Sequence, residues 1–143
     1  MESYFGTEEW IKAASYTLRY AIFVLEQEIP AHLEFDGKDA YYPNLVRFHQ
    51  EQPIATLRYQ KLNDEKVQFD RFCVAKDWRK RGIGREMLQT AEKRAKSDAF
   101  QEVYLVAEMA AVPFYEKQGY QPFSDPLIED GILCQQMRKK LHH

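Results

Sequence analysis

The chain has 143 residues, enough for one domain with a single buried core and too few for two ordinary domains. Hydrophobic residues make up 45%, aromatic residues 14% and charged residues 29%, a mixture that excludes a disordered tail and a membrane protein. Lys and Arg number 20 against 22 Asp and Glu, which argues against a nucleic-acid binder, because such a domain usually carries a strong basic excess. We therefore predict one globular domain over residues 1–143.

The first segment predicts a short strand followed by an amphipathic helix. Thr7 is the expected N-cap of this helix, and the carboxylates of the first turn suit its positive end. Apolar residues recur with a 3.6-residue period from Trp10 to Leu25. The start lacks the basic and then apolar stretch of a secretory signal, and no apolar run approaches the ~20 residues of a membrane span. We therefore expect a cytoplasmic protein without a membrane partner.

The middle of the chain predicts an antiparallel meander and then a crossover. Residues 26–43 are expected to form an irregular segment or a short helix, since prolines, Asp-Gly and acidic residues interrupt any period. Strand patterns follow at 44–50, 53–62 and 66–75, and an Asn-Asp-Glu turn joins the last two. Beyond a basic turn, a second helix precedes a strand at 102–107. The apolar face of that helix consists of Met87, Leu88, Ala91 and Ala95.

The last part of the chain predicts a short helix and two further strands. Pro113 is tolerated in the first turn of a helix, and Gly119 fits the left-handed residue that ends it. The tail forms two strands across an Asp-Gly turn. Cys73 and Cys134 are too few for a disulfide framework and lie in apolar strand patterns, so we expect buried, structural thiols. No histidines have the spacing of metal ligands, and no metal is predicted.

A basic turn with two glycines lies between the third strand of the meander and the second helix. Gly82 and Gly84 allow close approach of the main chain to a ligand, and N–H groups at a helix start form an anion site. Positive charge around the turn comes from Arg79, Lys80, Arg81 and Arg85. The turn therefore predicts a ligand with several phosphate charges, of which a pyrophosphate is the natural choice.

Two common phosphate-binding motifs do not fit this turn. A P-loop needs a Lys-Ser or Lys-Thr pair after a wider glycine spacing, and the turn has neither. A dinucleotide-binding fingerprint needs a small residue three places after Gly84, where this chain has Met87. The basic run could also bind nucleic acid, but the overall negative charge of the chain argues against that function.

The remaining pattern, Arg79-x-x-Gly82-x-Gly84 between an antiparallel strand and a helix, resembles the acetyl-CoA loop of GNAT-superfamily N-acetyltransferases. Downstream, AAVPFYEKQGYQPF is similar to the second signature of that family, A-x-x-F-Y-E-K-x-G followed by Phe or Tyr. Upstream, RYAIFVLEQE and EFD, with the late EDGI and a following methionine, are similar to the small ElaA-like branch. The resemblance covers nearly the whole chain.

The resemblance implies an acetyl-CoA-dependent transferase of the α/β (α+β) class. Its mixed, mostly antiparallel sheet of about six to seven strands would be flanked by helices and would splay between its fourth and fifth strands. Acetyl-CoA would lie in that gap as the acyl donor. Its implied contacts are Phe72, Cys73, Val74, Arg79, Lys80, Arg81, Gly82, Ile83, Gly84, Arg85, Glu108, Phe114 and Tyr115. Members of the family often have an asparagine where this chain has Glu108.

Acetyl transfer from a thioester needs a neutral amine, a stabilised oxyanion and a proton for the departing thiolate. Tyr115 matches the family position of the general acid, although an adjacent Phe and Tyr on a short helix also serve simply as core. Asp70 is the candidate base by the same resemblance. A carboxylate at that position can equally be paired with Arg58 or Arg71. A main-chain N–H near Val74 would meet the oxyanion.

The acetyl acceptor is left open by the sequence. Glu26, Glu34 and Asp36 are candidates for attracting a cationic amine, although charges in an irregular segment are often only solvated. The predicted function is transfer of an acetyl group to a primary amine of a small molecule or peptide by direct attack in a ternary complex. The alternative is a non-catalytic acyl-CoA-binding sensor or regulatory module of the same fold. In both cases we expect a monomer or a homodimer.

Overall fold

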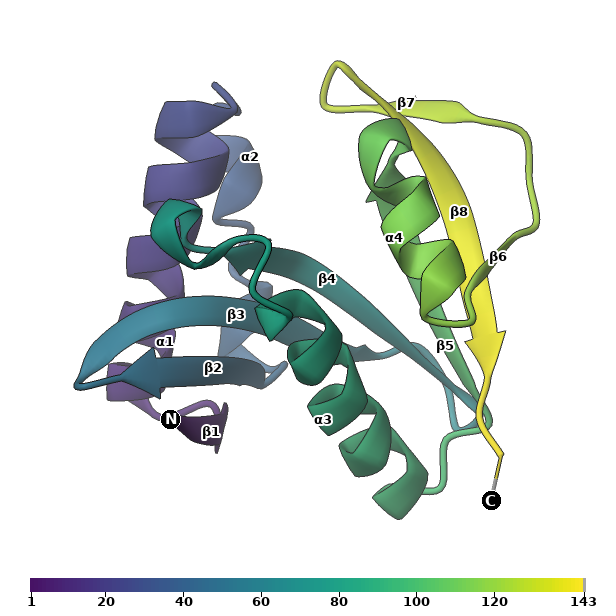
Figure 1. Cartoon of the computed structure of the whole chain (residues 1–143), viewed down its shortest axis with the longest axis horizontal. Helices are drawn as coiled ribbons and strands as arrows, with labels where there is room; N and C mark the ends of the chain where they lie inside the picture. The colour runs from purple at the N-terminus through teal and green to yellow at the C-terminus, as the bar shows by residue number, and fades with distance from the viewer. Residues whose placement is uncertain (143) are drawn as a thin grey trace.

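The computed structural model describes residues 1–142 and contains one mixed sheet of eight strands with helices on both faces (Figure 1). The strand order is β1-β2-β3-β4-β5-β8-β6, and β7 pairs with β8. The strands are β1 (Glu2–Gly6), β2 (Asn44–His49), β3 (Gln52–Lys61), β4 (Lys66–Val74), β5 (Glu102–Glu108), β6 (Gln121–Pro122), β7 (Leu127–Glu129) and β8 (Ile132–Lys140). The helices are α1 (Glu9–Arg19), α2 (Ala31–Glu34), α3 (Ile83–Ser97) and α4 (Val112–Lys117), with a π-helix η1 (Tyr20–Glu26) and the 3₁₀ turns η2 (Lys38–Ala40), η3 (Lys76–Trp78) and η4 (Met109–Ala111).

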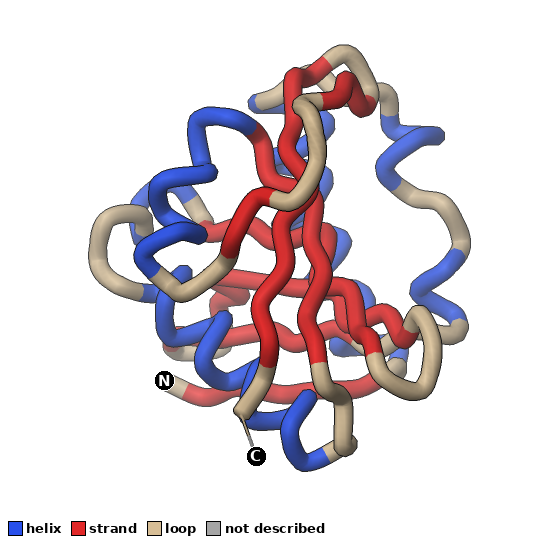
Figure 2. The backbone as a smooth tube through the Cα atoms, turned by 90° about the vertical axis from the view of Figure 1, so that its right-hand side faces the viewer, coloured by secondary structure: helices blue, strands red, loops and turns tan. Residues whose placement is uncertain are grey.

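The sheet opens between β4 and β5, its parallel pair. These strands are joined only at Lys66–Glu102, Val67–Val103 and Gln68–Tyr104. Beyond Gln68 both strands continue apart, β4 to Val74 and β5 to Glu108 (Figure 1). Figure 2 shows the β5 and β8 strands running at a steep angle to the other half of the sheet. The predicted splay between the fourth and fifth strands is confirmed.

The apolar core lies between the sheet and α3. Helix α3 buries the predicted face, Met87, Leu88, Ala91 and Ala95, in one cluster with side chains of β3, β4, β5 and β8. Strand β3 is buried on both sides, because α1 packs against its other face. On that side Thr56 of β3 donates a hydrogen bond to Ser15 of α1, and the neighbouring Arg58 is fully buried, so this second interface contains buried polar groups. Cys73 and Cys134 are buried in β4 and β8, as predicted.

The first helix differs from the prediction in its start and in its second half. It begins at Glu9 with Glu8 as N-cap, so Thr7 is not the capping residue. From Tyr20 onward it continues as a π-helix, whose wider turn rotates the following side chains relative to α1. The expected apolar face is only partly buried: Ile11, Leu18 and Ile22 are inside, while Trp10, which precedes the π-helix, and Leu25, which lies within it, are exposed.

Candidate functional site

A β-bulge in β4 prepares one wall of the gap. Thr56 faces Cys73 and Arg58 faces Asp70, so the single residue between them on β3 stands opposite two residues of β4. The extra residue is Arg71, whose φ of 50° lies in the left-handed region. A hydrogen bond outside the sheet stabilises this backbone conformation, because Nε of Arg71 donates to the carbonyl oxygen of Glu34 at 3.1 Å. The bulge turns the end of β4 away from β5.

The basic turn leads directly into α3 and uses its two glycines differently. Gly82 is the N-cap of α3 and has a φ of 81°, a conformation that side chains with a Cβ rarely adopt. A Cβ on Gly84 would lie 3.2 Å from the Phe114 ring, so this glycine permits α3 to approach α4 closely. The first N–H groups of α3 have no partner within the helix, and the helix dipole makes this end positive. The turn is therefore built to hold an anion.

A cavity of about 620 Å³ follows this turn into the gap, and we call it the loop cavity. It is lined by Phe72, Cys73, Val74, Trp78, Arg79, Lys80, Gly82, Ile83, Gly84, Arg85, Ala111, Phe114, Tyr115 and Gln118. Two of the residues predicted to contact the cofactor lie elsewhere. The Arg81 guanidinium is over the Trp78 ring, 4.9 Å from its centroid, and Glu108 faces a second cavity.

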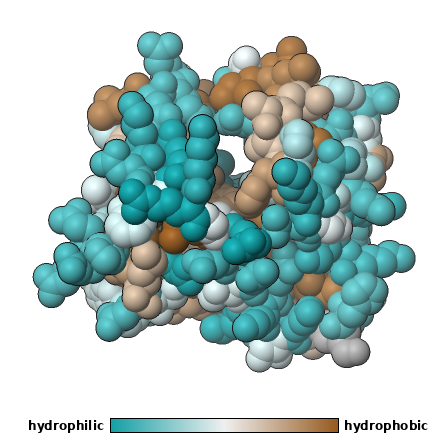
Figure 3. Space-filling view, in the orientation of Figure 1, coloured by the Kyte–Doolittle hydropathy of each residue, from teal (hydrophilic) through white to brown (hydrophobic). Residues whose placement is uncertain are grey.

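The second cavity, of about 310 Å³, lies between η1, β4, β5 and the β7–β8 hairpin, and we call it the acidic cavity. Six carboxylates and two guanidinium groups line it. The carboxylates belong to Glu26, Glu34, Asp70, Glu108, Glu129 and Asp130, and the guanidinium groups to Arg71 and Arg79. Such an excess of negative charge attracts a cation. In Figure 3 the surface is hollowed through at this place, with strongly hydrophilic residues on one side of the opening.

The two cavities share one wall, where the end of β4 faces α4. The residues common to both are Phe72, Cys73, Val74, Arg79, Ala111 and Tyr115. Tyr115 is half-buried there, with its ring edge-on to the rings of Phe72 and Phe114. Burial raises the pKa of the Tyr115 phenol, and the negative charge of Glu108 and the neighbouring Cys73 raise it further. Tyr115 therefore keeps its proton at neutral pH.

Comparisons with known proteins agree with this geometry. Residues 24–141 match the acetyltransferase (GNAT) domain family. The chain belongs to the GNAT family of acetyltransferases. It is 34% identical to the uncharacterised N-acetyltransferase YjcF of Bacillus subtilis, over 92% of this chain and 94% of that protein.

Solved structures of this GNAT fold superimpose along almost the whole chain. A crystal structure assigned as an N-acetyltransferase from Lactobacillus plantarum has a TM-score of 0.94 at 36% identity, covering 99% of this chain and 98% of that one. The crystal structure of Escherichia coli ElaA has a TM-score of 0.85 at 26% identity, covering 96% and 98%. The similarity to the ElaA-like branch that the sequence suggested is confirmed.

Within this GNAT fold, Asp70 has the alternative arrangement that the sequence left open. Both of its oxygens accept hydrogen bonds from Arg58, Nε to Oδ1 at 3.0 Å and Nη2 to Oδ2 at 2.8 Å. Arg71, the other partner considered, binds Glu34 and Asp36 instead. Asp70 still lines the acidic cavity, but as one half of an ion pair.

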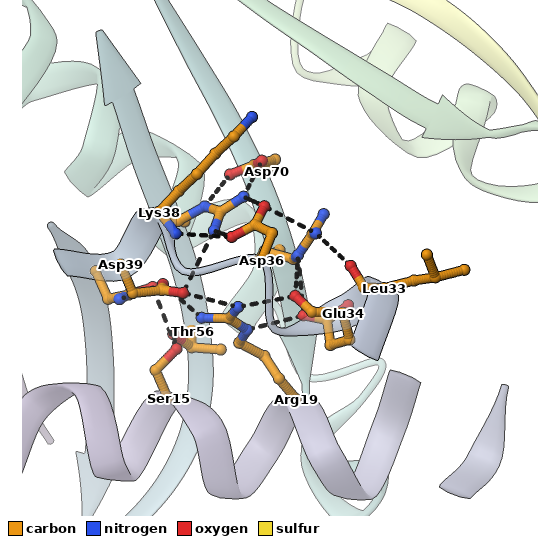
Figure 4. Close-up of polar contacts among 12 residues, drawn as sticks. Ser15, Arg19, Leu33, Glu34, Asp36, Lys38, Asp39, Thr56 and Asp70 are labelled. Carbon is orange, nitrogen blue, oxygen red and sulfur yellow. Dashed lines mark hydrogen bonds and ion pairs between the residues drawn. The ribbon is translucent and has the colours of Figure 1, made fainter. Parts of the chain in front are cut away.

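The Asp70 pair belongs to a buried network of seven charged residues between α1 and the sheet (Figure 4). Its members are Arg19, Glu34, Asp36, Asp39, Arg58, Asp70 and Arg71. Arg19 is fully buried between Glu34 and Asp39, at 2.9 and 2.7 Å. Buried charges are tolerated only when they are paired in this manner. The network fixes the floor of the acidic cavity.

The three carboxylates predicted to bind the acceptor have different positions. Glu26 lines the acidic cavity and pairs with Arg79, and Glu34 lines it from the buried network. Asp36 is not among the lining residues, and its two oxygens accept hydrogen bonds from Arg58 at 2.8 and 3.0 Å. Asp36 thus contacts the cavity only indirectly, through the Arg58 guanidinium that also binds Asp70.

Sequence reasoning missed the hairpin wall and the π-helical wall of the acidic cavity. Asp130 was assigned only to the Asp-Gly turn and Glu129 was given no role in the site, although the β7–β8 hairpin brings both to the cavity. Ile22, Phe23 and Gln27 reach it because η1 widens the helix at that point. A periodicity analysis contains no signal for either, because both depend on where distant elements meet.

Proposed function

We propose that this GNAT protein transfers an acetyl group from acetyl-CoA to a primary amine by direct attack in a ternary complex. The observation that carries the proposal is the meeting of the loop cavity and the acidic cavity at Tyr115. One cavity suits a polyanionic donor, and the other suits a cationic acceptor. Their shared wall is where a thioester and an amine would come together.

The residues of the loop cavity fit the proposed donor. The start of α3, Gly82 and the neighbouring basic side chains suit a pyrophosphate. Beyond Gln68, β4 has no pairing with β5, so main-chain groups of Phe72–Val74 on that side are placed to bind the amides of a pantetheine arm. Two proteins of the same fold support this assignment. One, from Elizabethkingia anophelis, was solved with acetyl-CoA bound, and the other, an aminoglycoside 6'-N-acetyltransferase, was solved with coenzyme A.

When bound, acetyl-CoA would supply an activated acetyl thioester. Tyr115 holds a proton at the shared wall and is the proposed donor to the leaving thiolate. The main-chain N–H near Val74 is the proposed partner of the oxyanion. Cys73 is an unsuitable nucleophile, because burial raises the pKa of its thiol far above neutrality. The amine therefore attacks the thioester without a covalent enzyme intermediate.

A carboxylate of the acidic cavity must receive the proton of the incoming ammonium group, directly or through water, because an amine with a pKa near ~10 is protonated at neutral pH. Asp70 and Glu108 are the two candidates. Arg58 donates a hydrogen bond to each oxygen of Asp70, so both oxygens are already engaged with the guanidinium. Glu108 faces the cavity from the end of β5 and acts electrostatically on Tyr115. We assign the role of base to Glu108 in preference to Asp70.

The first experiment is a thermal-shift comparison of acetyl-CoA, CoA, ATP and NAD, followed by thiol detection with a panel of primary amines. A ligand at ~100 times its Kd stabilises a protein by about 2.7 kcal/mol, which is easily measured. We expect stabilisation by the two CoA species only, and thiol release with cationic amines. Stabilisation without thiol release from any amine would favour the non-catalytic acyl-CoA sensor. Stabilisation by ATP or NAD alone would refute the donor assignment.

A further inference from the structure

Arg79 and Glu26 form a two-point ion pair between the basic turn and η1. Nη1 of Arg79 donates to Oε2 of Glu26 at 2.8 Å, and Nη2 donates to Oε1 at 2.9 Å. Nε donates to the carbonyl oxygen of Val74 at 3.0 Å, which fixes the direction of the guanidinium. The hydrogen bonds from Arg79 lower the pKa of Glu26, so the carboxylate is ionised at neutral pH. The pair joins η1 to the first residue of the basic turn.

The pair also lies on the boundary between the two cavities. Arg79 lines both of them, whereas Glu26 lines only the acidic cavity. A pyrophosphate in the loop cavity and the Glu26 carboxylate would therefore compete for one guanidinium, because both are anions that arginine binds through two parallel hydrogen bonds. The two side chains are 36% and 43% exposed, so separating them does not leave a buried charge unpaired.

Release of Glu26 changes the acidic cavity. While Glu26 is paired, its negative charge is largely cancelled by the guanidinium of Arg79. Once freed, it adds one uncompensated carboxylate to the cavity proposed for the amine. A ligand that frees Glu26 thus raises the affinity of the acidic cavity for a cation. By linkage, a cation bound in the acidic cavity raises the affinity for that ligand by the same factor.

We propose that Glu26 is an acceptor-binding carboxylate that Arg79 masks until the pyrophosphate of the donor takes the guanidinium. This inference rests on the proposed function and adds a coupling to it, since binding of the donor completes the acceptor site. Glu26 is then a specificity-determining residue for cationic amines. Its ion pair opposes donor binding in the free protein.

The test begins with calorimetric titration of CoA into wild-type protein, Glu26→Gln and Glu28→Gln. Glu28 is exposed and lies outside the lining of both cavities, so its variant controls for the loss of one negative charge. We expect Glu26→Gln to bind CoA about two- to fivefold more tightly than wild type, in keeping with the strength of a partly exposed ion pair. Equal affinity in Glu26→Gln and Glu28→Gln would overturn the proposal.

A double-mutant cycle with Arg79→Gln separates competition from general electrostatics. If Glu26 acts by occupying Arg79, its substitution changes the Kd for CoA only while Arg79 is present. The same gain in the Arg79→Gln background would show that Glu26 merely repels the polyanion, and would overturn the proposal. Absence of CoA binding in wild type would instead overturn the proposed function, on which this inference depends.

Spermidine serves as a cationic probe for the acceptor half of the proposal. We expect saturating CoA to tighten spermidine binding to wild type, and to have no such effect in Glu26→Gln. Glu28→Gln should behave as wild type does. Equal enhancement of spermidine binding in Glu26→Gln and wild type would show that Glu26 takes no part in completing the acceptor site.

Discussion

Tyr115 tests the chemical part of the proposal most directly. Its phenol lies on the wall shared by both cavities and retains its proton because burial and Glu108 raise its pKa. We expect Tyr115→Phe to lower kcat by about 100-fold, the usual contribution of a positioned acid, with little change in the Kd for CoA. Stopped-time thiol release and calorimetry measure the two quantities. Tyr104→Phe, which removes a hydroxyl from a partly buried tyrosine outside both cavities, is the matched control.

An unchanged kcat in Tyr115→Phe would assign Tyr115 to the core, the alternative that its sequence allowed. A large rise in the Kd for CoA with an unchanged kcat would make it a binding residue. The position of Tyr115 beside Phe114 was predictable from the FYEKQG pattern, and so were most contacts of the loop cavity. Its environment was not predictable, because Glu108 and Cys73 reach Tyr115 from two different strands.

Asp70 and Glu108 are distinguished by replacing each with its amide. We expect Glu108→Gln to lower kcat by about 100-fold, because it removes the proposed base. Asp70→Asn should act mainly on stability, since it weakens the buried pair with Arg58. The measurements are kcat, the Kd for CoA and thermal unfolding. A large loss of kcat in Asp70→Asn but not in Glu108→Gln would identify Asp70 as the base. A raised Kd for CoA in Glu108→Gln would show that Glu108 binds the acetyl donor.

The contact between the start of α3 and α4 predicts a specific effect at Gly84. A valine there would place its Cβ 3.2 Å from the Phe114 ring, and its two methyl groups would crowd the same contact. Overpacking of this kind costs about 1–3 kcal/mol, and it would displace the turn proposed to bind the pyrophosphate. We expect Gly84→Val to weaken CoA binding and to lower the free energy of unfolding in urea. Native affinity for CoA would show that the loop cavity is not the donor site.

Helix α3 and the first helix show why elements differ in how well they can be predicted. Met87, Leu88, Ala91 and Ala95 repeat at helical spacing, and tertiary packing then uses the same face. In the first helix the same reasoning placed Trp10 and Leu25 inside, although they are 51% and 65% exposed. A π-helix follows no distinct residue pattern, so its change of phase at Tyr20 could not be found. The bulge at Arg71 was missed for the same reason.

Across the whole molecule, the arrangement of the sheet and of the basic turn followed from two local motifs, whereas most of the ion pairs did not. The network joins Arg19 of α1 to Asp39 and Glu34, and it joins Arg58 of β3 to Asp70 of β4. In the sequence most of these residues look like solvated charges of a helix and an irregular segment, and only the pair of Asp70 with Arg58 was considered. Only the packing of α1 against the polar face of β3 shows that they are buried partners.

This network makes the stability of the protein sensitive to acid. Burial alone would raise the pKa of Asp36, but hydrogen bonds from Arg58 and the Lys38 main chain, with nearby positive charge, lower it far below its ordinary 3.8. The pKa of Asp39 is lowered in the same way, mainly by Arg19 acting against burial. Depressed carboxylate pKa values contribute stability above the unfolded pKa, and that stability is lost as the pH falls through the folded pKa. Burial raises the pKa of Glu34. A raised carboxylate pKa has the opposite effect, because the stability that it contributes is lost as the pH rises through the folded pKa.

We therefore expect the free energy of unfolding to fall steadily below a pH of about 4, where the unfolded carboxylates begin to take up protons. Asp36→Asn should be less stable than wild type at neutral pH, because a neutral amide binds Arg58 less strongly than a carboxylate does. Since this variant has no proton to gain at that position, its stability should decline less between pH 4 and pH 2. Urea unfolding at a series of pH values measures both curves. The control is Asp64→Asn, at a fully exposed carboxylate, whose stability should change with pH as that of wild type does. If the stability of Asp36→Asn falls with pH in parallel with wild type, Asp36 does not cause the loss of stability in acid.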